Sequence, residues 1–235
     1  MTHCTILIPA YNTRPWIQNA VFSALAQDWP DFDVFVVDDG STDGTGTMVE
    51  HLLRGRQVSL WKMPHRGLPA VLADGIKMAS GPVITFVASD DYMEPTALSA
   101  VVPHFDDPKV GFVWSAWRFM GKEESGWSRS LPQGRTLWQS LVLDGWWKAG
   151  CHQFFSKEWY LRSRGLDIKI PYAVDYQLAI LLAETGCKTV HVSTPTYRYR
   201  YPRPGSISHS NGRRQRECCA RLRREARNRA GGRTS

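Results

Sequence analysis

Two neighbouring carboxylates, Asp90 and Asp91, follow a short apolar run at residues 83–87. Because Gly and Pro precede this run, it is typical of a buried strand. In an open α/β sheet, ligands bind beyond the carboxyl ends of the strands. Carboxylate oxygens are hard ligands that suit Mg²⁺ or Mn²⁺, and such ions usually bind one or two carboxylates together with the phosphates of a substrate. The pair therefore predicts a divalent-cation site at the end of a strand; the alternative is a solvated turn before Pro95.

A second acidic segment begins with Asp38 and Asp39, directly after another continuous apolar run. A carboxylate at position 39 is suited to accept a hydrogen bond from an imide N–H, such as that of uracil or thymine. Tyr11 follows the apolar run at residues 5–9, and its ring could stack on a nucleobase. The alternative for the acidic segment is an Asx-rich turn before the next helix. Both can hold, because Asp43 can cap the helix while Asp39 binds.

Apolar runs and amphipathic segments alternate through the first half of the chain. Short apolar runs between breakers predict strands, and apolar positions with a 3.6-residue period predict the helices between them. This alternation predicts βαβ units with right-handed crossovers, and hence an α/β fold with a Rossmann-like, mostly parallel central sheet and helices on both faces. The expected strands are residues 5–9, 34–37, 58–61 and 83–87, and the expected helices begin near Pro15, Thr45 and Leu68.

The second half of the chain is less regular. Residues 121–134 are polar and turn-prone, so we expect a surface loop or a flap over the site. Trp138, Trp146 and Trp147 lie close in sequence and predict either ordinary core packing or a platform for a sugar ring. The expected helices are residues 95–105 and 173–183, and the expected strands are residues 110–120, 151–155, 189–192 and 197–201.

The composition indicates a globular protein with an anionic partner. The chain has 235 residues, 43% of them hydrophobic, and a formal net charge of +7, which suits a nucleotide, a phospholipid surface or nucleic acid as partner. The five cysteines show no metal-ligand spacing, which favours reduced thiols in the cytoplasm. Residues 5–10 are too short an apolar run for a signal peptide, and no stretch approaches the roughly 20 apolar residues of a membrane span.

Several segments, taken in order, resemble the motifs of family 2 glycosyltransferases. The most diagnostic is Val37-Asp38-Asp39-Gly40-Ser41-Thr42-Asp43, and the others are residues 5–12, 23–27, 88–91, 174–178 and 204–208. The resemblance implies a GT-A fold with a C-terminal acceptor-side subregion. It also implies an inverting transfer from a nucleotide-sugar donor, expected to be a UDP-sugar, with Mn²⁺ or Mg²⁺. The expected acceptor is a hydroxyl of a saccharide or lipid-linked molecule in polysaccharide or glycolipid synthesis.

The resemblance assigns roles to single residues. Asp91 matches the metal ligand and Asp175 the catalytic base, although an Asp before an apolar helical run is often an N-cap instead, which would lower its pKa. Arg203, Ser206 and Trp147 are candidates for contacts with the diphosphate or the acceptor, and His209 is a candidate late metal ligand or a solvated loop residue. The residues implied in nucleotide binding are Pro9, Tyr11, Asn12, Asp38, Asp39 and Asp90.

The sequence departs from the family pattern at four positions. The family often has an acidic residue in place of Val174, a further Asp in place of Ala88 and an Asn in place of Ala73. It often has His in place of Arg203, which could contact a diphosphate through a bidentate guanidinium. These departures keep a first alternative open, a non-catalytic module that binds nucleotide sugars. A nucleotidyltransferase, the second alternative, would open with a glycine-rich, basic phosphate loop, which residues 9–13 lack.

The carboxyl terminus is strongly basic. Residues 213–229 contain eight arginines and two glutamates, with apolar residues at helical spacing. This pattern predicts either a solvated helical extension or a cationic helix that lies against an anionic membrane surface, near a lipid-linked acceptor. Nothing in it resembles a groove-reading motif, so we expect no nucleic acid. We therefore expect a glycosyltransferase domain at residues 1–212 (nucleotide-sugar-binding half 1–105, acceptor half 106–212), a basic tail at 213–235, and a cytoplasmic protein, with peripheral contact to the inner face of the membrane as the alternative.

Overall fold

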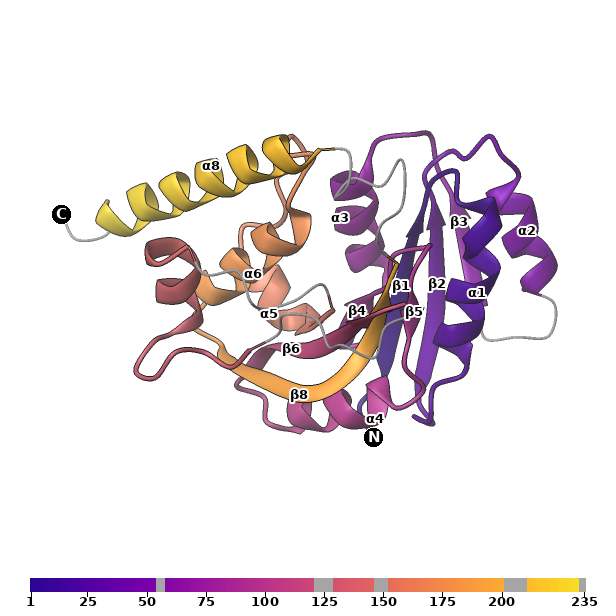
Figure 1. Ribbon diagram of the computed structural model, residues 1–235. Helices are drawn as coiled ribbons and strands as arrows, with labels where there is room; N and C mark the ends of the chain where they lie inside the picture. Colours follow the sequence, from indigo (N-terminus) through magenta and orange to yellow (C-terminus); the bar gives the residue numbers. More distant parts are fainter. Residues whose placement is uncertain (54–57, 121–128, 146–151, 201–210, 233–235) are drawn as a thin grey trace.

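The computed structural model describes residues 1–53, 58–120, 129–145, 152–200 and 211–232. Its centre is one eight-stranded sheet with the strand order β3-β2-β1-β4-β7-β6-β8-β5. Helices cover both faces of this sheet, and the long helix α8 lies at the end of the molecule farthest from α1 and α2 (Figure 1). The predicted α/β class is confirmed.

The first half of the chain forms the parallel part of the sheet. Strand β1 pairs in parallel with β2 and with β4, and β2 pairs in parallel with β3. Helices α1 and α2 lie on one face and α3 on the other (Figure 1), so the chain changes face before it returns to β4. The elements are β1 (Cys4–Ala10), α1 (Arg14–Leu25), β2 (Phe32–Asp38), α2 (Thr45–Leu52), β3 (Val58–Lys62), α3 (Leu68–Met78) and β4 (Val83–Phe86).

The second half extends the sheet with mixed pairing. Strand β7 runs antiparallel to both β4 and β6, β6 runs parallel to β8, and β8 runs antiparallel to β5. The elements are β5 (Tyr92–Met93), α4 (Ala97–Val101), the 3₁₀-helix η1 (Val102–Asp106), β6 (Val110–Phe119), the π-helix η2 (Gln139–Leu143), β7 (Gln153–Ser156), α5 (Lys157–Arg162), α6 (Val174–Glu184), β8 (Lys188–Tyr199) and α8 (Gly212–Gly231).

Two predicted segments of this half differ in the structure. The strands expected at residues 189–192 and 197–201 form one strand, β8, whose pairing with β6 shifts register on either side of Pro195. Because Pro lacks an N–H, it usually interrupts a ladder, but the register shifts accommodate Pro195 within one strand here. The helix expected at residues 95–105 divides into α4 and η1, since Pro103 cannot donate the next α-helical hydrogen bond.

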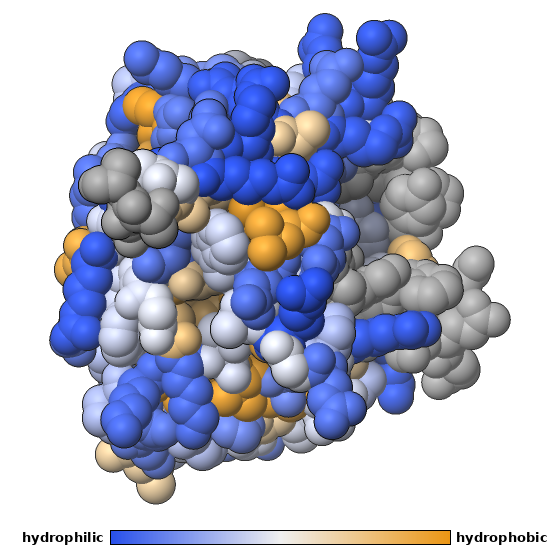
Figure 2. Space-filling model, turned by 90° about the vertical axis from the view of Figure 1, so that its left-hand side faces the viewer, coloured by the Kyte–Doolittle hydropathy of each residue, from blue (hydrophilic) through white to orange (hydrophobic). Residues whose placement is uncertain are grey.

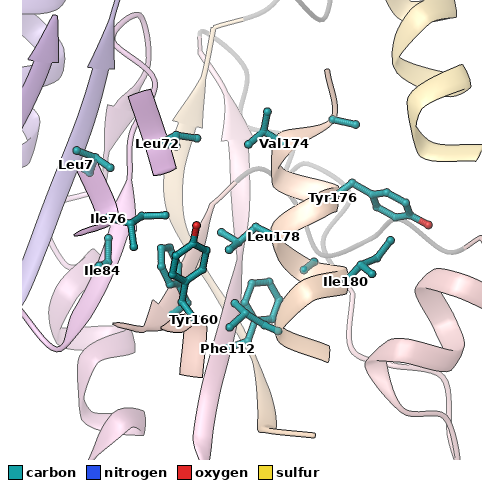
Figure 3. Packing of buried hydrophobic residues seen from close by; sticks show 14 of the residues in the cluster. Leu7, Leu72, Ile76, Ile84, Phe112, Tyr160, Val174, Tyr176, Leu178 and Ile180 are labelled. Atoms are coloured by element: carbon teal, nitrogen blue, oxygen red, sulfur yellow. The ribbon is translucent and has the colours of Figure 1, made fainter. Parts of the chain in front are cut away.

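Alternating residues of the strands face two separate hydrophobic cores. Ile6 and Ile8 point into a cluster with the inner faces of α1, α2 and α4. Leu7 points to the opposite face, where it packs with Ile76 of α3 and with the cluster that includes α6 (Figure 3). This period of two is expected for strands covered on both sides, and it fixes which face each helix covers.

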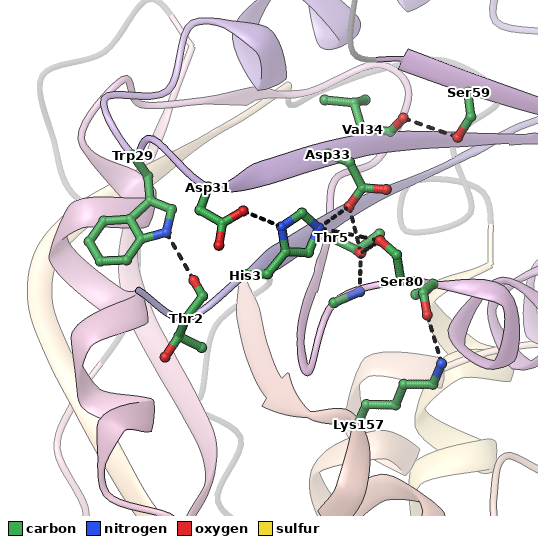
Figure 4. A network of polar contacts seen from close by, with 12 residues as sticks. Thr2, His3, Thr5, Trp29, Asp31, Asp33, Val34, Ser59, Ser80 and Lys157 are labelled. Atoms are coloured by element: carbon green, nitrogen blue, oxygen red, sulfur yellow. Dashed lines mark hydrogen bonds and ion pairs between the residues drawn. The ribbon is translucent and has the colours of Figure 1, made fainter.

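A polar network ties the amino ends of the strands together (Figure 4). His3 bridges two carboxylates, with Nδ1 at 2.6 Å from Asp31 Oδ1 and Nε2 at 3.0 Å from Asp33 Oδ1. The Thr5 hydroxyl donates to Asp33 Oδ1 at 2.7 Å and lies 3.2 Å from Ser80 Oγ. These carboxylates hold the start of β1 against β2, at the edge of the sheet away from the pocket described below.

Helix α8 packs on the body of the protein. Leu222 and Ala226 are buried against η2 and α6, as part of the same core that contains Leu7. The Arg229 guanidinium lies 2.6 Å from Glu184 Oε1 at the end of α6. Among the described residues, no helix combines the length and the apolar character that crossing a membrane requires.

Candidate active site

A pocket of about 350 Å³ opens at the carboxyl ends of β1 and β4. Neighbouring strands whose connections leave on opposite faces create a crevice, which is where open α/β sheets bind ligands. Both halves of the chain and helix α8 contribute to its walls. The lining includes Pro9, Tyr11, Asp39, Leu68, Val71, Phe86, Asp90, Asp91, Tyr172, Val174, Asp175, Tyr197 and Gln215. The structure thus brings six of the predicted site residues together: Pro9, Tyr11, Asp39, Asp90, Asp91 and Asp175.

The turn before α3 fixes the Asp39 carboxylate with backbone donors. Arg66 N donates to Oδ1 at 2.7 Å and Gly67 N donates to Oδ2 at 2.8 Å, while His65 Nδ1 lies 2.9 Å from Oδ2. Gly67 has a φ of +89°, a left-handed conformation that favours glycine, and this allows successive N–H groups to point at one carboxylate. A carboxylate has about four acceptor sites, so Asp39 keeps capacity for an N–H donor from the pocket.

Tyr11 stands at the entrance of the same wall. This residue is 44% exposed, and the ring of His65 stacks on the ring of Tyr11 with a centroid separation of 4.0 Å and an interplanar angle of 20°. This spacing leaves no room for a base between the two rings. Tyr11 lines the pocket whereas His65 does not, so a base in the pocket would meet the ring of Tyr11 beside the Asp39 carboxylate.

Asp38 and Asn12 lie outside the lining of the pocket. Ser41 N donates to Asp38 Oδ1 at 3.0 Å, and the other carboxylate oxygen stands so close to Gly46 of α2 that a Cβ there would collide with it. Thr42 N donates to Asn12 Oδ1 at 2.9 Å. In this structure both side chains brace the loop between β2 and α2, and their predicted contact with a nucleotide stays a prediction.

Asp91 is a buried carboxylate held by strand β8. It is 2% exposed. The Tyr197 hydroxyl donates to Oδ2 at 2.7 Å and Arg200 N donates to Oδ1 at 2.8 Å. Burial and the neighbouring charge of Asp90 raise the pKa of Asp91 to about 7, and the two donors oppose this shift. The pairing of β5 with β8 places these donors, which lie more than 100 residues away in sequence.

The Asp90–Asp91 pair fits a divalent cation. Two adjacent carboxylates concentrate negative charge at the pocket, and this charge adds to burial in raising the pKa of Asp91. Among the described residues, no cluster of three or more His, Cys, Asp or Glu side chains could hold a metal by itself. Mg²⁺ and Mn²⁺ do not need such a cluster, because they commonly combine one or two carboxylates with waters and substrate phosphates.

Asp175, in the first turn of α6, lines the same pocket as these carboxylates. The N-cap of this helix is Ala173, with a φ of +57° and no side-chain cap, so the alternative that Asp175 is the N-cap is wrong. Tyr176 N donates to Asp175 Oδ1 at 2.9 Å, and no side chain in the described part of the chain is recorded as a donor to this carboxylate. Burial raises the pKa of Asp175 to about 6, against the lowering effect of these backbone N–H groups. A carboxylate that ionises near neutral pH and faces a pocket is a good candidate for a general base.

Four predicted residues lie outside the described residues: Trp147, Arg203, Ser206 and His209. Conversely, the structure adds residues that the sequence interpretation did not assign to the site. Tyr197 was expected only as part of a half-exposed strand, and Gln215 only as part of the tail. Alternation of aromatic and basic residues was the one signal at Tyr197, and for Gln215 there was none.

Comparison with known proteins places this chain among the glycosyltransferases. The chain is 29% identical over 199 residues to the chondroitin synthase of Pasteurella multocida, which covers 82% of this chain and 20% of the synthase. It is 31% identical over 216 residues to the UDP-Glc:alpha-D-GlcNAc-diphosphoundecaprenol beta-1,3-glucosyltransferase WfaP of Escherichia coli, which covers 87% of this chain and 79% of WfaP. The chain spans about a fifth to a quarter of the length of the chondroitin and hyaluronan synthases that it matches.

Solved structures share the fold at low sequence identity. The crystal structure of S. aureus TarS 1-349 in complex with UDP-GlcNAc matches with a TM-score of 0.68 and 20% identity, over 89% of this chain and 61% of that one. The mannosyltransferase PcManGT from Pyrobaculum calidifontis in complex with GDP-Man and Mn²⁺ matches with a TM-score of 0.66 and 21% identity, over 86% of this chain and 58% of that one. This likeness confirms the predicted GT-A fold.

The family itself follows from the sequence match over the region that forms most of the pocket. The description of the matching family is Glycosyl transferase family 2, and the match covers residues 5–165. That is more than half of the chain, and it includes β1, β2 and β4 with Asp39, Asp90 and Asp91. The chain belongs to glycosyl transferase family 2.

Proposed function

We propose that this chain is an inverting glycosyltransferase that moves a sugar from a nucleotide diphosphate sugar to a hydroxyl of a saccharide or lipid-linked acceptor. One observation carries the proposal. A single pocket of about 350 Å³ is lined by Tyr11 and Asp39, which follow β1 and β2, by the Asp90–Asp91 pair after β4, and by Asp175 in the first turn of α6. These are the three parts that such a transfer needs: recognition of the nucleotide, neutralisation of the diphosphate and a base for the acceptor.

The relatives support a UDP-sugar donor. TarS has been solved with UDP and with UDP-GlcNAc, and the name of WfaP specifies UDP-Glc as its donor. On this chain, Tyr11 would stack on the uracil ring and Asp39 would accept its imide N–H. Since the backbone already fixes the Asp39 carboxylate, little ordering would be needed on binding.

Asp91, with Asp90, would hold a divalent metal. PcManGT, solved with Mn²⁺, supports this assignment but does not choose between Mn²⁺ and Mg²⁺ for this chain. When bound, the metal neutralises the diphosphate leaving group as a Lewis acid. The Tyr197 hydroxyl and Arg200 N hold the Asp91 carboxylate in one orientation, which is how outer donors commonly orient a metal ligand.

Asp175 would act as the base. The acceptor hydroxyl forms a bond to the anomeric carbon while the bond from that carbon to the diphosphate oxygen breaks. Asp175 takes the hydroxyl proton, and the nucleoside diphosphate leaves with the bonding electron pair. One carboxylate acting on one face of the sugar gives inversion. A pKa of about 6 keeps Asp175 mostly ionised at neutral pH and still basic enough to accept a proton.

We further propose that the halves predicted from the sequence divide this work. Residues 1–105 supply the nucleotide and metal contacts, and residues 106–212 supply the base. The acceptor would enter from the side of α6 and α8, because Asp175, Tyr172 and Gln215 line that wall. The name of WfaP specifies a sugar linked through a diphosphate to a lipid, which supports a lipid-linked acceptor and a place at the cytoplasmic membrane surface for this chain.

Thermal unfolding against UDP, GDP, dTDP and CMP, each with Mn²⁺ or with EDTA, tests the donor side. A ligand at 100 times its dissociation constant stabilises a protein by about 2.7 kcal/mol, or about 5 to 10 °C for a chain of this size. We expect a shift with UDP and Mn²⁺ that EDTA removes. A shift with another nucleotide would replace the donor, and no shift with any of them would favour a non-catalytic member of the family.

A further inference from the structure

A second pocket, which we call the arginine pocket, lies beside α8. Its volume is about 450 Å³, and its lining is Leu143, Asp144, Gly145, Ala220, Arg223, Arg224 and Arg227. Three of its seven residues are arginines and one is acidic. The upper part of the face in Figure 2, where α8 lies, is strongly hydrophilic.

The arginines of this pocket differ from most others of the same helix. Arg213, Arg221 and Arg229 form ion pairs with Glu217, Glu225 and Glu184. Among the described residues, no carboxylate is recorded as an ion-pair partner of Arg223, Arg224 or Arg227. The one acidic residue of the pocket, Asp144, pairs instead with Arg135 at 3.1 Å. The pocket therefore keeps a net positive charge.

Neutral groups hold two of the three guanidinium groups in place. Arg227 Nη2 donates to Val142 O at 2.8 Å and to Leu143 O at 3.1 Å, which orients the side chain and leaves its charge uncompensated. The Arg223 side chain interacts with the Tyr176 hydroxyl and passes close to Gly145. Ordered guanidinium groups without carboxylate partners are suited to bidentate contact with phosphate oxygens.

Helices α6 and α8 connect the arginine pocket to the active-site pocket. Tyr176 follows Asp175 in sequence, and its hydroxyl donates to Leu141 O of η2 at 2.6 Å. Gln215, near the start of α8, lines the active-site pocket. Arg223 lies eight residues further along the same helix, a rise of about 12 Å. A molecule with a sugar beside Asp175 and an anionic group about 12 Å further along α8 than Gln215 would reach both pockets.

We propose that the arginine pocket binds the diphosphate of a lipid-linked saccharide acceptor. The proposal rests on the glycosyltransferase function and names its acceptor class. The saccharide would lie beside Asp175, the diphosphate would contact Arg223, Arg224 and Arg227, and the lipid would continue into the membrane. Anionic phospholipid headgroups carry the same phosphate chemistry, so phospholipid vesicles form a separate arm of the test.

Calorimetric titration of the full chain with geranyl diphosphate tests the proposal, in the presence of UDP and Mn²⁺ to occupy the donor site. The test variant is R223Q/R224Q, which spares Arg227 because its guanidinium also holds η2. The matched control is R213Q/R221Q, which removes two charges from the same helix at ion-paired positions. We expect one-to-one binding, a loss of affinity of about tenfold or more in the test variant, and little change in the control.

Three results would overturn the proposal: equal losses in the two double variants, no one-to-one binding by the unchanged chain, or geranyl diphosphate binding that both variants retain. Flotation with phosphatidylglycerol vesicles separates the sources of phosphate. If R223Q/R224Q lost vesicle binding and kept geranyl diphosphate binding, the pocket would be a headgroup site instead. Failure of UDP to bind would count against the glycosyltransferase function, and it would leave the difference between the two double variants readable.

Discussion

The two edges of the central sheet carry carboxylates in opposite settings. At the amino edge, Asp31 and Asp33 are partly exposed and share the ring of His3 (Figure 4). At the carboxyl edge, Asp91 and Asp175 face a pocket, and burial raises their pKa values to about 7 and about 6. In the first setting each charge has a partner within the fold. In the second setting, burial disfavours the ionised carboxylates, so their charge lowers the stability of the folded protein.

This difference separates stabilising carboxylates from functional ones. An ion pair at a partly exposed edge contributes modestly to stability and needs no ligand. A buried carboxylate with a raised pKa opposes folding when it is ionised, so its presence in a pocket indicates a role in binding or catalysis. Neutralising a carboxylate of the carboxyl-edge pocket should therefore impair binding or turnover, whereas neutralising one at the amino edge should leave both unchanged.

Replacing Asp175 with Asn should strongly reduce turnover and spare donor binding. General-base catalysis contributes about 10²- to 10⁴-fold, so we expect kcat to fall by about 10³-fold, with the dissociation constant of UDP unchanged. Initial rates with a UDP-sugar donor, together with calorimetry of UDP, measure the two effects. Asp33→Asn at the amino edge is the control and should leave both unchanged. If the Asp175→Asn variant kept its turnover, another group would be the base.

The pH dependence of kcat should report the ionisation of Asp175. Because burial raises its pKa to about 6, the base is protonated below that pH. We expect kcat to fall about tenfold for each pH unit below 6 and to level off above 7. Rates at saturating donor and acceptor between pH 5 and 8 would show this limb. A kcat that stayed level down to pH 5, as the ordinary carboxyl pKa of 3.8 would give, would contradict the assignment.

The Asp175→Asn substitution should stabilise the protein above neutral pH. The folded pKa of Asp175 lies above its unfolded value, so the ionised carboxylate lowers the free energy of unfolding above pH 6, and this penalty disappears as the pH falls towards 4. Since each pKa unit corresponds to about 1.4 kcal/mol and the pocket gives some solvent access, we expect a gain of about 1 to 2 kcal/mol for Asp175→Asn at pH 8. Urea unfolding at pH 8 and at pH 4.5 should show a clearly larger gain at the higher pH.

Replacing His3 at the amino edge should lower the free energy of unfolding, by less than Asp175→Asn raises it. Burial lowers the pKa of His3, but its hydrogen bonds and charge interactions with Asp31 and Asp33 outweigh burial and raise the pKa above 6.5. Its stabilisation is therefore full below pH 6.5 and is lost as the pH rises through the raised folded pKa. We expect His3→Gln to cost less than about 1 kcal/mol at pH 6 and nothing at pH 9. An equal cost at both pH values would mean that the ring acts by packing alone.

Sequence patterns were sufficient for the parallel half of the fold and for the residues that end its strands. The apolar runs before Asp39 and Asp91 form β2 and β4, because local periodicity and breakers determine such strands. Their carboxyl ends meet at one edge, so the residues that follow them share a pocket. Asp175 could be placed only through the resemblance, since nothing local distinguishes it from an N-cap.

The remaining features depend on contacts between distant parts of the chain. Tyr197 reaches Asp91 only because β8 runs on through the register shifts around Pro195, and no local pattern predicts a continuous strand there. Asp38 was predicted to bind a nucleotide together with Asp39. Successive residues at the end of a strand point to opposite faces, which sends Asp38 towards α2 and Asp39 towards the pocket.

Calorimetric titration of UDP with Mn²⁺ into the unchanged chain, Asp39→Asn and Asp33→Asn compares the two edges most directly. We expect one-to-one binding that EDTA abolishes. It should weaken by about 10- to 100-fold in Asp39→Asn, since a hydrogen bond to a charged group contributes about 1.5 to 3 kcal/mol, and it should be unchanged in Asp33→Asn. Unfolding temperatures of both variants would confirm that they fold. Equal affinities in all three proteins, or equal losses in both variants, would contradict the assignment of the carboxyl-edge pocket as the donor site.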